Sequence, residues 1–117
     1  MKLLRYFVTD DGSLPELEVR YSNPNKVSKA FEFLFANNAR NVTAGGGIAD
    51  CTLPDLGVLV MPSSLNIDYR MGSAWGASEV NALLILLKEL CGLGGTLVAP
   101  WWGAEGEHEF TEALRRA

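Results

Sequence analysis

The chain has 117 residues, enough for one domain around one hydrophobic core and too few for two cores. Hydrophobic residues make up 48% of it and the net charge is only −4, which argues against a disordered chain. Residues 50–117 hold nine Asp/Glu against four Lys/Arg. This acidic half argues against binding to nucleic acid or membranes and favours a basic protein partner, with ordinary solubility as the alternative interpretation.

The N-terminal segments predict a β-hairpin. Residues 3–8 (LLRYFV) and 16–21 (ELEVRY) have strand-like compositions, and Asp11-Gly12 between them is a turn signal. The second segment alternates apolar and polar residues, with Leu17, Val19 and Tyr21 on one side. We therefore expect a sheet with one covered and one solvent-facing side.

Residues 22–38 predict the first helix. Ser22 or Asn23 can cap it, Pro24 suits its first position, and apolar residues recur at helical spacing from Val27 to Leu34. Residues 40–44 predict a short strand, followed by the loop Gly45-Gly46-Gly47. This loop lacks the residues that complete a P-loop or a dinucleotide fingerprint, so it is interpreted as a turn or bulge.

The second half predicts another hairpin and two further helices. Residues 57–61 (GVLVM) indicate a buried strand, and residues 65–71 (LNIDYRM) an alternating one. Ser78 is expected to cap a strongly periodic helix that ends at Gly92. A short strand at 96–100 and a short amphipathic helix from Glu107 complete the chain.

The predicted order is β-β-α-(β)-β-β-α-β-α, within a single α+β domain spanning residues 1–117. We expect a two-layer sandwich: a mainly antiparallel sheet of five to six strands, two main helices on one face, and a short C-terminal helix. The open face would display Glu16, Glu18, Arg20, Asn66, Asp68 and Arg70.

Catalytic and metal-binding motifs are not recognised. His108 is the chain's one histidine, and the glutamates around it suit a first helical turn without any catalytic role. Cys51 and Cys91 are forty positions apart, a spacing that matches no zinc or redox motif, and Cys91 falls on an apolar helix face. We therefore predict no catalytic residues, no metal site and no cofactor. With no signal peptide and no long apolar run, a cytoplasmic location is expected.

The tryptophans and nearby charges are the candidate binding residues. Trp75, Trp101 and Trp102 lie in predicted turns, and one of the adjacent pair is expected to point outward beside acidic side chains. Asp68 and Arg70 share a strand face, either as a surface charge ladder or as a binding or catalytic pair. The predicted partner-binding residues are Asp68, Arg70, Trp75, Trp101, Trp102, Glu105, Glu107 and Glu109.

The stretches WWGAEGEHE (101–109) and DYRMGSAWG (68–76) resemble, in general type, those of small bacterial toxin-immunity proteins. This resemblance implies a non-enzymatic cytoplasmic protein that neutralises a cognate toxin, commonly a basic nuclease, by occluding its active site. Two alternatives remain open. One is a small enzyme or ligand-binding domain that uses Asp68, Arg70 and His108, and the other is a homo-oligomer that buries the open sheet face.

Overall fold

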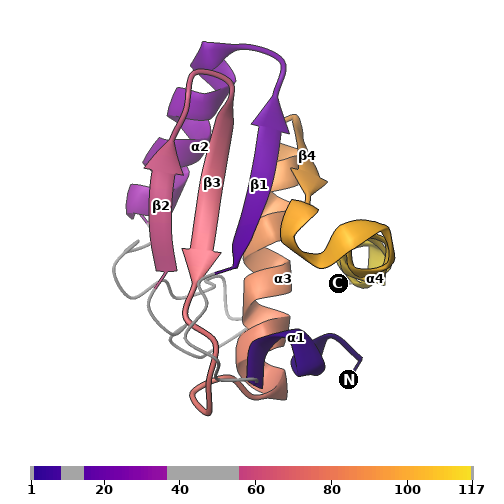
Figure 1. Cartoon of the computed structure of the whole chain (residues 1–117). Helices are drawn as coiled ribbons and strands as arrows, with labels where there is room; N and C mark the ends of the chain where they lie inside the picture. The colour runs from indigo at the N-terminus through magenta and orange to yellow at the C-terminus, as the bar shows by residue number, and fades with distance from the viewer. Residues whose placement is uncertain (1, 9–14, 37–55, 117) are drawn as a thin grey trace.

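The computed structural model describes residues 2–8, 15–36 and 56–116. They form a β-sheet with helices packed around it (Figure 1), which confirms the predicted α+β class. The strands are β1 (Glu16–Tyr21), β2 (Leu56–Val60), β3 (Ser64–Tyr69) and β4 (Gly95–Val98). The helices are α1 (Arg5–Val8), α2 (Pro24–Ala36), α3 (Ala77–Gly92) and α4 (Gly103–Arg116), with the 3-10 turns η1 (Lys2–Leu4) before α1 and η2 (Pro100–Trp102) before α4.

The described strands form one antiparallel sheet in the order β2-β3-β1-β4. β2 and β3 make a hairpin, as predicted, and a hydrogen bond from the Met61 N–H to the Ser64 carbonyl (2.9 Å) closes its turn. β1 lies between β3 and β4, with Leu17 opposite Ile67. An early strand is thus held by partners from the middle and the end of the chain.

One face of the sheet is buried and the other meets solvent, as the alternation in β1 predicts. Leu17, Val19 and Ile67 are fully buried, and Figure 1 shows α2 and α3 behind this face. On the other face Glu16 is exposed and Asp68 is half-buried. We call this second face the open sheet face; its side chains are Glu16, Glu18, Arg20, Leu59, Ser64, Asn66, Asp68, Thr96 and Val98.

α2 begins as the sequence predicts. The Asn23 Oδ1 accepts a hydrogen bond from the Lys26 N–H (3.1 Å), and Pro24 is the first helical residue. Val27 and Leu34 are 2% and 1% exposed, so the predicted apolar stripe faces the core.

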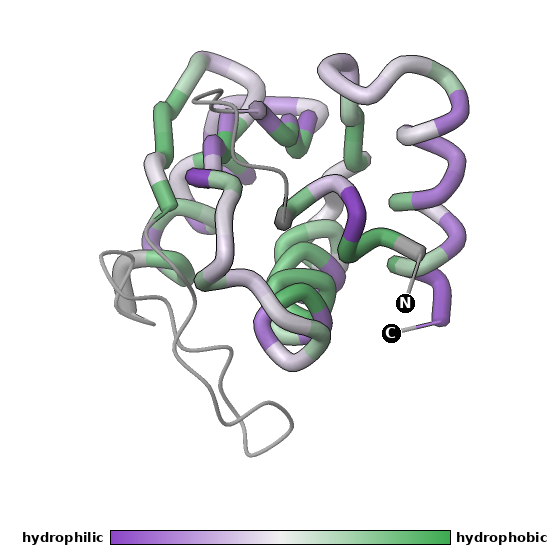
Figure 2. The backbone as a smooth tube through the Cα atoms, turned by 60° about the horizontal axis from the view of Figure 1, so that its bottom comes forward, coloured by the Kyte–Doolittle hydropathy of each residue, from purple (hydrophilic) through white to green (hydrophobic). Residues whose placement is uncertain are grey.

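α3 begins earlier than predicted, and Ser78 lies inside its first turn instead of capping it. Gly76 is the N-cap residue, and its N–H donates to the Glu79 Oε1 (3.0 Å). The helix ends at Gly92, as predicted. Cys91 packs against the core, and burial raises the pKa of its thiol. Figure 2 shows α3 as a largely hydrophobic coil at the centre of the molecule and α4 as a more hydrophilic coil at its margin.

The predicted N-terminal strand is wrong, because residues 2–8 form η1 and α1. In a strand, Leu3, Arg5 and Phe7 would share one face. In the helical conformation Leu3 and Phe7 are 2% and 0% exposed while Arg5 stays at the surface. The helical turns therefore keep the charge out of the core. The turn signal Asp11-Gly12 lies outside the described residues.

The strand predicted at 57–61 forms as β2, but it is not buried. β2 stands at one end of the described strand order, and Leu59 and Val60 are 57% and 45% exposed. The described residues contain four strands against the five to six predicted. The strand expected at 40–44, the glycine loop after it and Cys51 lie outside the described residues.

The C-terminal elements also begin earlier than predicted. β4 ends at Val98, and Pro100 is the first residue of η2, where its fixed φ suits a helical start. α4 starts at Gly103 instead of Glu107, so Glu105 is the acidic residue of its first turn.

Candidate functional site

The chain turns sharply between β4 and α4, and this turn contains both adjacent tryptophans. The Trp102 N–H donates to the Ala99 carbonyl (3.3 Å). Gly103 follows with a φ of 70°, a left-handed conformation that glycine adopts without strain. The Glu107 Oε2 accepts a hydrogen bond from the Ala99 N–H (3.1 Å). Glu107 thus stabilises the turn against α4. The sequence predicted Glu107 as a partner-binding residue and did not predict this structural role.

The turn directs its two tryptophans differently. Trp102 packs on the Tyr6 ring, with centroids 4.6 Å apart, and on the Tyr69 ring at 6.4 Å. Trp101 is 52% exposed and meets Trp102 edge-on, with centroids 6.5 Å apart. The outward residue is therefore Trp101. Its exposure follows from the packing of Trp102 in an aromatic cluster and not, as expected, from alternation at a strand end.

Trp75 lies in the core and has no surface to offer a partner. It is 2% exposed, and its ring packs on Phe7 (4.6 Å between centroids) and Tyr69 (5.6 Å). Its Nε1–H donates to the Arg70 carbonyl (2.7 Å), which satisfies the indole and ties the residue after β3 to the core. The expectation that Trp75 belongs to a binding surface is corrected accordingly.

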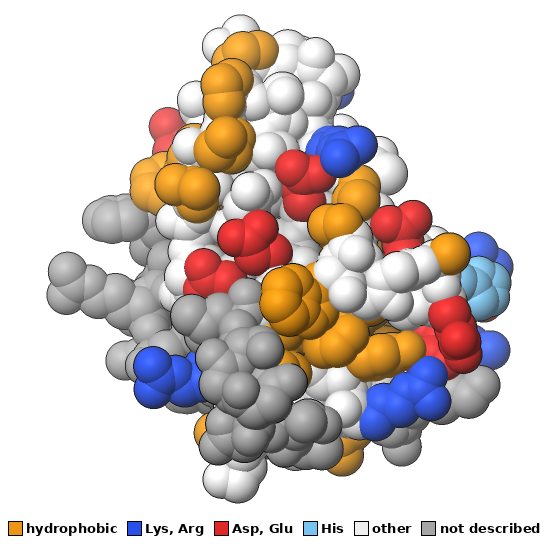
Figure 3. All heavy atoms as spheres, viewed as in Figure 1, with side chains coloured by type: hydrophobic (Ala, Val, Ile, Leu, Met, Phe, Trp, Pro, Cys, Tyr) orange, Lys and Arg blue, Asp and Glu red, His pale blue; other side chains and the backbone are white. Residues whose placement is uncertain are grey.

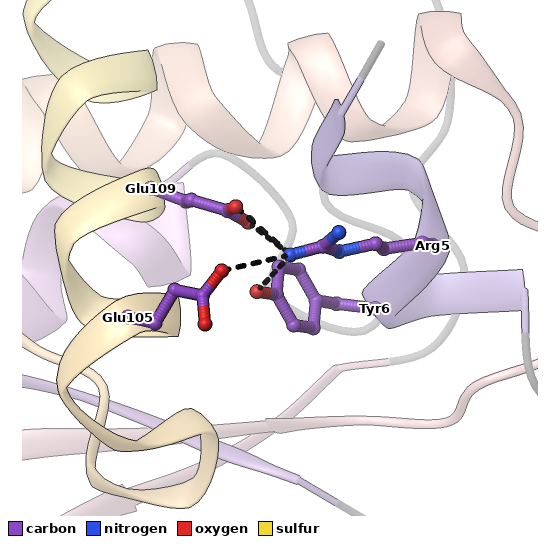
Figure 4. A network of polar contacts seen from close by, with 4 residues as sticks. All are labelled: Arg5, Tyr6, Glu105 and Glu109. Atoms are coloured by element: carbon purple, nitrogen blue, oxygen red, sulfur yellow. Dashed lines mark hydrogen bonds and ion pairs between the residues drawn. The ribbon is translucent and has the colours of Figure 1, made fainter.

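Arg5 joins the N-terminal helix to α4 (Figure 4), a contact that sequence reasoning missed. One guanidinium nitrogen donates to both oxygens of Glu109 (2.8 and 3.0 Å) and to the Tyr6 hydroxyl (2.9 Å), and lies 3.9 Å from a Glu105 oxygen. The guanidinium carbon is 4.9 Å from the centre of the Tyr6 ring. The hydrogen bond with Tyr6 and the charge of Glu109 raise the pKa of Arg5. Glu109 is therefore locally neutralised.

The three predicted glutamates of α4 thus have three different environments. Glu107 bonds to the backbone and Glu109 pairs with Arg5, with only 12% of its side chain exposed. The Glu105 side chain is 84% exposed, and its Oε1 is 3.9 Å from the nearest Arg5 guanidinium nitrogen, which is long for an ion pair. Of the three, Glu105 is the carboxylate that solvent or a partner can reach.

Asp68 and Arg70 lie at the end of β3. Asp68 is half-buried on the open sheet face, where its carboxylate lies across Gly57 of β2 and directly opposite Glu16 of β1. Arg70 is exposed just beyond the strand. In the described part of the chain, no ion pair includes Asp68 or Arg70.

His108 is exposed on α4. Among the described residues, no hydrogen bond or ion pair joins His108 to Asp68 or Arg70. The alternative site of Asp68, Arg70 and His108 therefore has no such contact to hold it together in this part of the chain. Within residues 2–8, 15–36 and 56–116, no three His, Cys, Asp or Glu side chains gather closely enough to hold a metal ion.

The open sheet face and the turn around η2 form one continuous side of the molecule. Figure 3 shows hydrophobic side chains gathered beside the open sheet, with acidic side chains on either side of them. Trp101 is the most exposed aromatic residue in the described part of the chain. We call Trp101, Trp102 and Glu105 the Trp101 corner.

Comparisons with protein-family models, curated protein sequences and solved structures find no match for this chain. Of the helices in the described ranges, none has the length and apolarity needed to cross a membrane.

Proposed function

We propose that this protein binds a protein partner through the Trp101 corner. The observation that carries this proposal is the 52% exposure of Trp101, next to a Trp102 that packs in an aromatic cluster. An exposed indole held by a packed neighbour is already ordered, so it loses little conformational freedom when a partner covers it. Tryptophan is also enriched among the residues that dominate binding energy in interfaces.

The charge of the surface indicates the kind of partner. The chain carries a net charge of −4, and the exposed Glu105 carboxylate belongs to the same corner as Trp101. A surface of this kind steers a basic protein toward it and selects against acidic ones. We assign the protein to the immunity or inhibitor type: a cytoplasmic, non-enzymatic domain that occludes the active site of a basic, nuclease-type toxin.

Site-specific crosslinking tests the proposal. A photo-crosslinking phenylalanine analogue is placed at position 101, and as a control at Lys29, which is exposed on α2. Crosslinking is carried out in the producing cell, and the captured protein is purified and assayed for nuclease activity. We expect a basic protein that crosslinks at position 101 but not at position 29, and whose activity is inhibited at one-to-one stoichiometry.

Binding of the captured protein to variants completes the test. Trp101→Ala should weaken it by about 2 kcal/mol or more, roughly thirty-fold. Leu93→Ala is the matched control, because Leu93 is a similarly exposed apolar residue (40%) at the end of α3. Equal affinities of Trp101→Ala and Leu93→Ala would contradict the proposal, as would capture of a second copy of this chain alone.

A further inference from the structure

Two carboxylates oppose each other on the open sheet face. Glu16 in β1 is directly opposite Asp68 in β3. Side chains in this position are about 5 Å apart at Cβ, and like charges there destabilise a sheet. No ion pair of the described residues includes either carboxylate. The sheet therefore carries a local repulsion that these residues do not relieve.

The next row of the same face is arranged differently. Glu18 lies opposite Asn66, and its carboxylate forms an ion pair with Arg20. Glu18 is thus neutralised by its own strand. Among the described residues, the carboxylates of these two rows without an ion-pair partner are therefore those of Glu16 and Asp68.

Further acceptors and apolar surface surround this pair. Gly57 has no side chain at the position that the Asp68 carboxylate covers. The Asn66 Oδ1 is enclosed and accepts no hydrogen bond within the described residues. η2, which contains Trp101, packs against β1, and Figure 3 shows acidic and hydrophobic side chains adjacent on this side. Among the described residues, the surface around this pair therefore contains an acceptor without a hydrogen-bond partner, the Asn66 Oδ1, and it borders on the turn that contains Trp101.

We propose that this part of the open sheet face binds an arginine-bearing segment of the protein partner, with a guanidinium between the carboxylates of Glu16 and Asp68. A guanidinium has five N–H donors in a rigid plane, pairs with carboxylates through two hydrogen bonds, and stacks on indole rings such as that of Trp101. It would supply a positive charge to Glu16 and Asp68, which form no ion pair among the described residues, and a donor to the unpartnered Asn66 Oδ1. The inference rests on the proposed protein-binding function and adds the residues and chemistry of the segment that docks.

Neutralising either carboxylate should act in opposite directions on stability and on binding. Asp68→Asn and Glu16→Gln remove the repulsion in the free protein, so the urea midpoint should rise. The same variants halve the charge that meets the guanidinium, so affinity should fall about three- to ten-fold. A carboxylate with a purely structural role would instead lower the midpoint when it is replaced.

A hexa-arginine peptide with blocked ends is the probe. It is titrated into nitrogen-15-labelled protein, and the backbone and indole N–H shifts are followed by NMR. We expect the largest shifts at residues 16–18 and 66–68 and at the Trp101 indole. Glu89→Gln is the matched control, because it makes the same charge change at an exposed position on α3, behind the opposite face of the sheet. It should bind the peptide as the wild type does.

Equal affinity of the wild type, Asp68→Asn and Glu16→Gln for this peptide would overturn the inference. Shifts centred on α3, or equally tight binding of a hexalysine peptide, would overturn it too. The two proposals can fail separately. A captured partner that requires Trp101 but is indifferent to Glu16 and Asp68 leaves the protein-binding function in place and removes the arginine site.

Discussion

Replacing Gly106 in α4 by alanine should destabilise the protein, although the same change stabilises most helix interiors. Gly106 is buried against Trp102. A Cβ built on Gly106 falls inside 3.0 Å of the Trp102 Cβ, 3.2 Å from its Cγ and 3.7 Å from the Tyr6 hydroxyl. Because the nearest atom is bonded directly to the backbone, a change of rotamer cannot remove the clash. η2 itself must move.

Two contributions of opposite sign set the magnitude. Alanine is favoured over glycine in a helix interior by about 1 kcal/mol. Overpacking a well-packed site costs about 1–3 kcal/mol, and the upper part of this range applies where backbone must shift. We therefore expect Gly106→Ala to lower the free energy of unfolding by about 1–2 kcal/mol and to displace the Trp101 corner.

Urea unfolding followed by far-ultraviolet circular dichroism measures this loss, and tryptophan fluorescence of the native state detects the displaced ring. Gly92→Ala is the matched control, since Gly92 ends α3, is not in the left-handed region, and an added Cβ there meets nothing within 4 Å. This variant should gain about 0.4–1 kcal/mol. Gly106→Ala at or above wild-type stability would refute the close packing of Trp102 on α4.

Two further predictions concern buried polar groups. Glu107→Ala should lower the free energy of unfolding by about 1–3 kcal/mol, because the buried Ala99 N–H loses its acceptor. Glu107→Gln keeps an acceptor oxygen and should recover most of this loss in urea unfolding; equal losses would show that the N–H finds another partner. Burial, and to a smaller extent the charge of Cys91, raises the pKa of Tyr21 to about 12, from an ordinary value of about 10. The folded state favours the neutral Tyr21 hydroxyl. The stability that this preference contributes is complete below about pH 10 and is lost between about pH 10 and 12. Tyr21→Phe should therefore flatten the fall of the urea midpoint across this window, and a fall as steep as that of the wild type would contradict the shift.

The elements that the sequence predicted well are those with an unambiguous period. β1 and β3 alternate strictly, and α3 repeats its leucines at helical spacing over four turns. Each pattern leaves only one conformation that buries all its apolar residues on one side. The strands, the main helices and the polar character of the open sheet face follow from such local patterns.

Residues 3–8 show where local patterns fail. Their composition is strand-like, yet Leu3 and Phe7 bury together only in helical turns, with Arg5 facing α4. The signal against a strand was the position of Arg5 midway between Leu3 and Phe7. A strand would place the Arg5 charge on the same face as these two apolar side chains. A segment this short has little conformational preference of its own, so the core that receives it decides.

The sequence by itself determined that an acidic domain has adjacent tryptophans in a turn and that one of them faces outward. Only the tertiary structure decided that it is Trp101, because Tyr6 and Tyr69, remote in sequence, enclose Trp102. Likewise, Arg5 neutralises Glu109 across 104 positions and leaves Glu105 exposed. Local periodicity specifies which face of an element is apolar, whereas contacts between distant segments select which polar and aromatic groups stay at the surface.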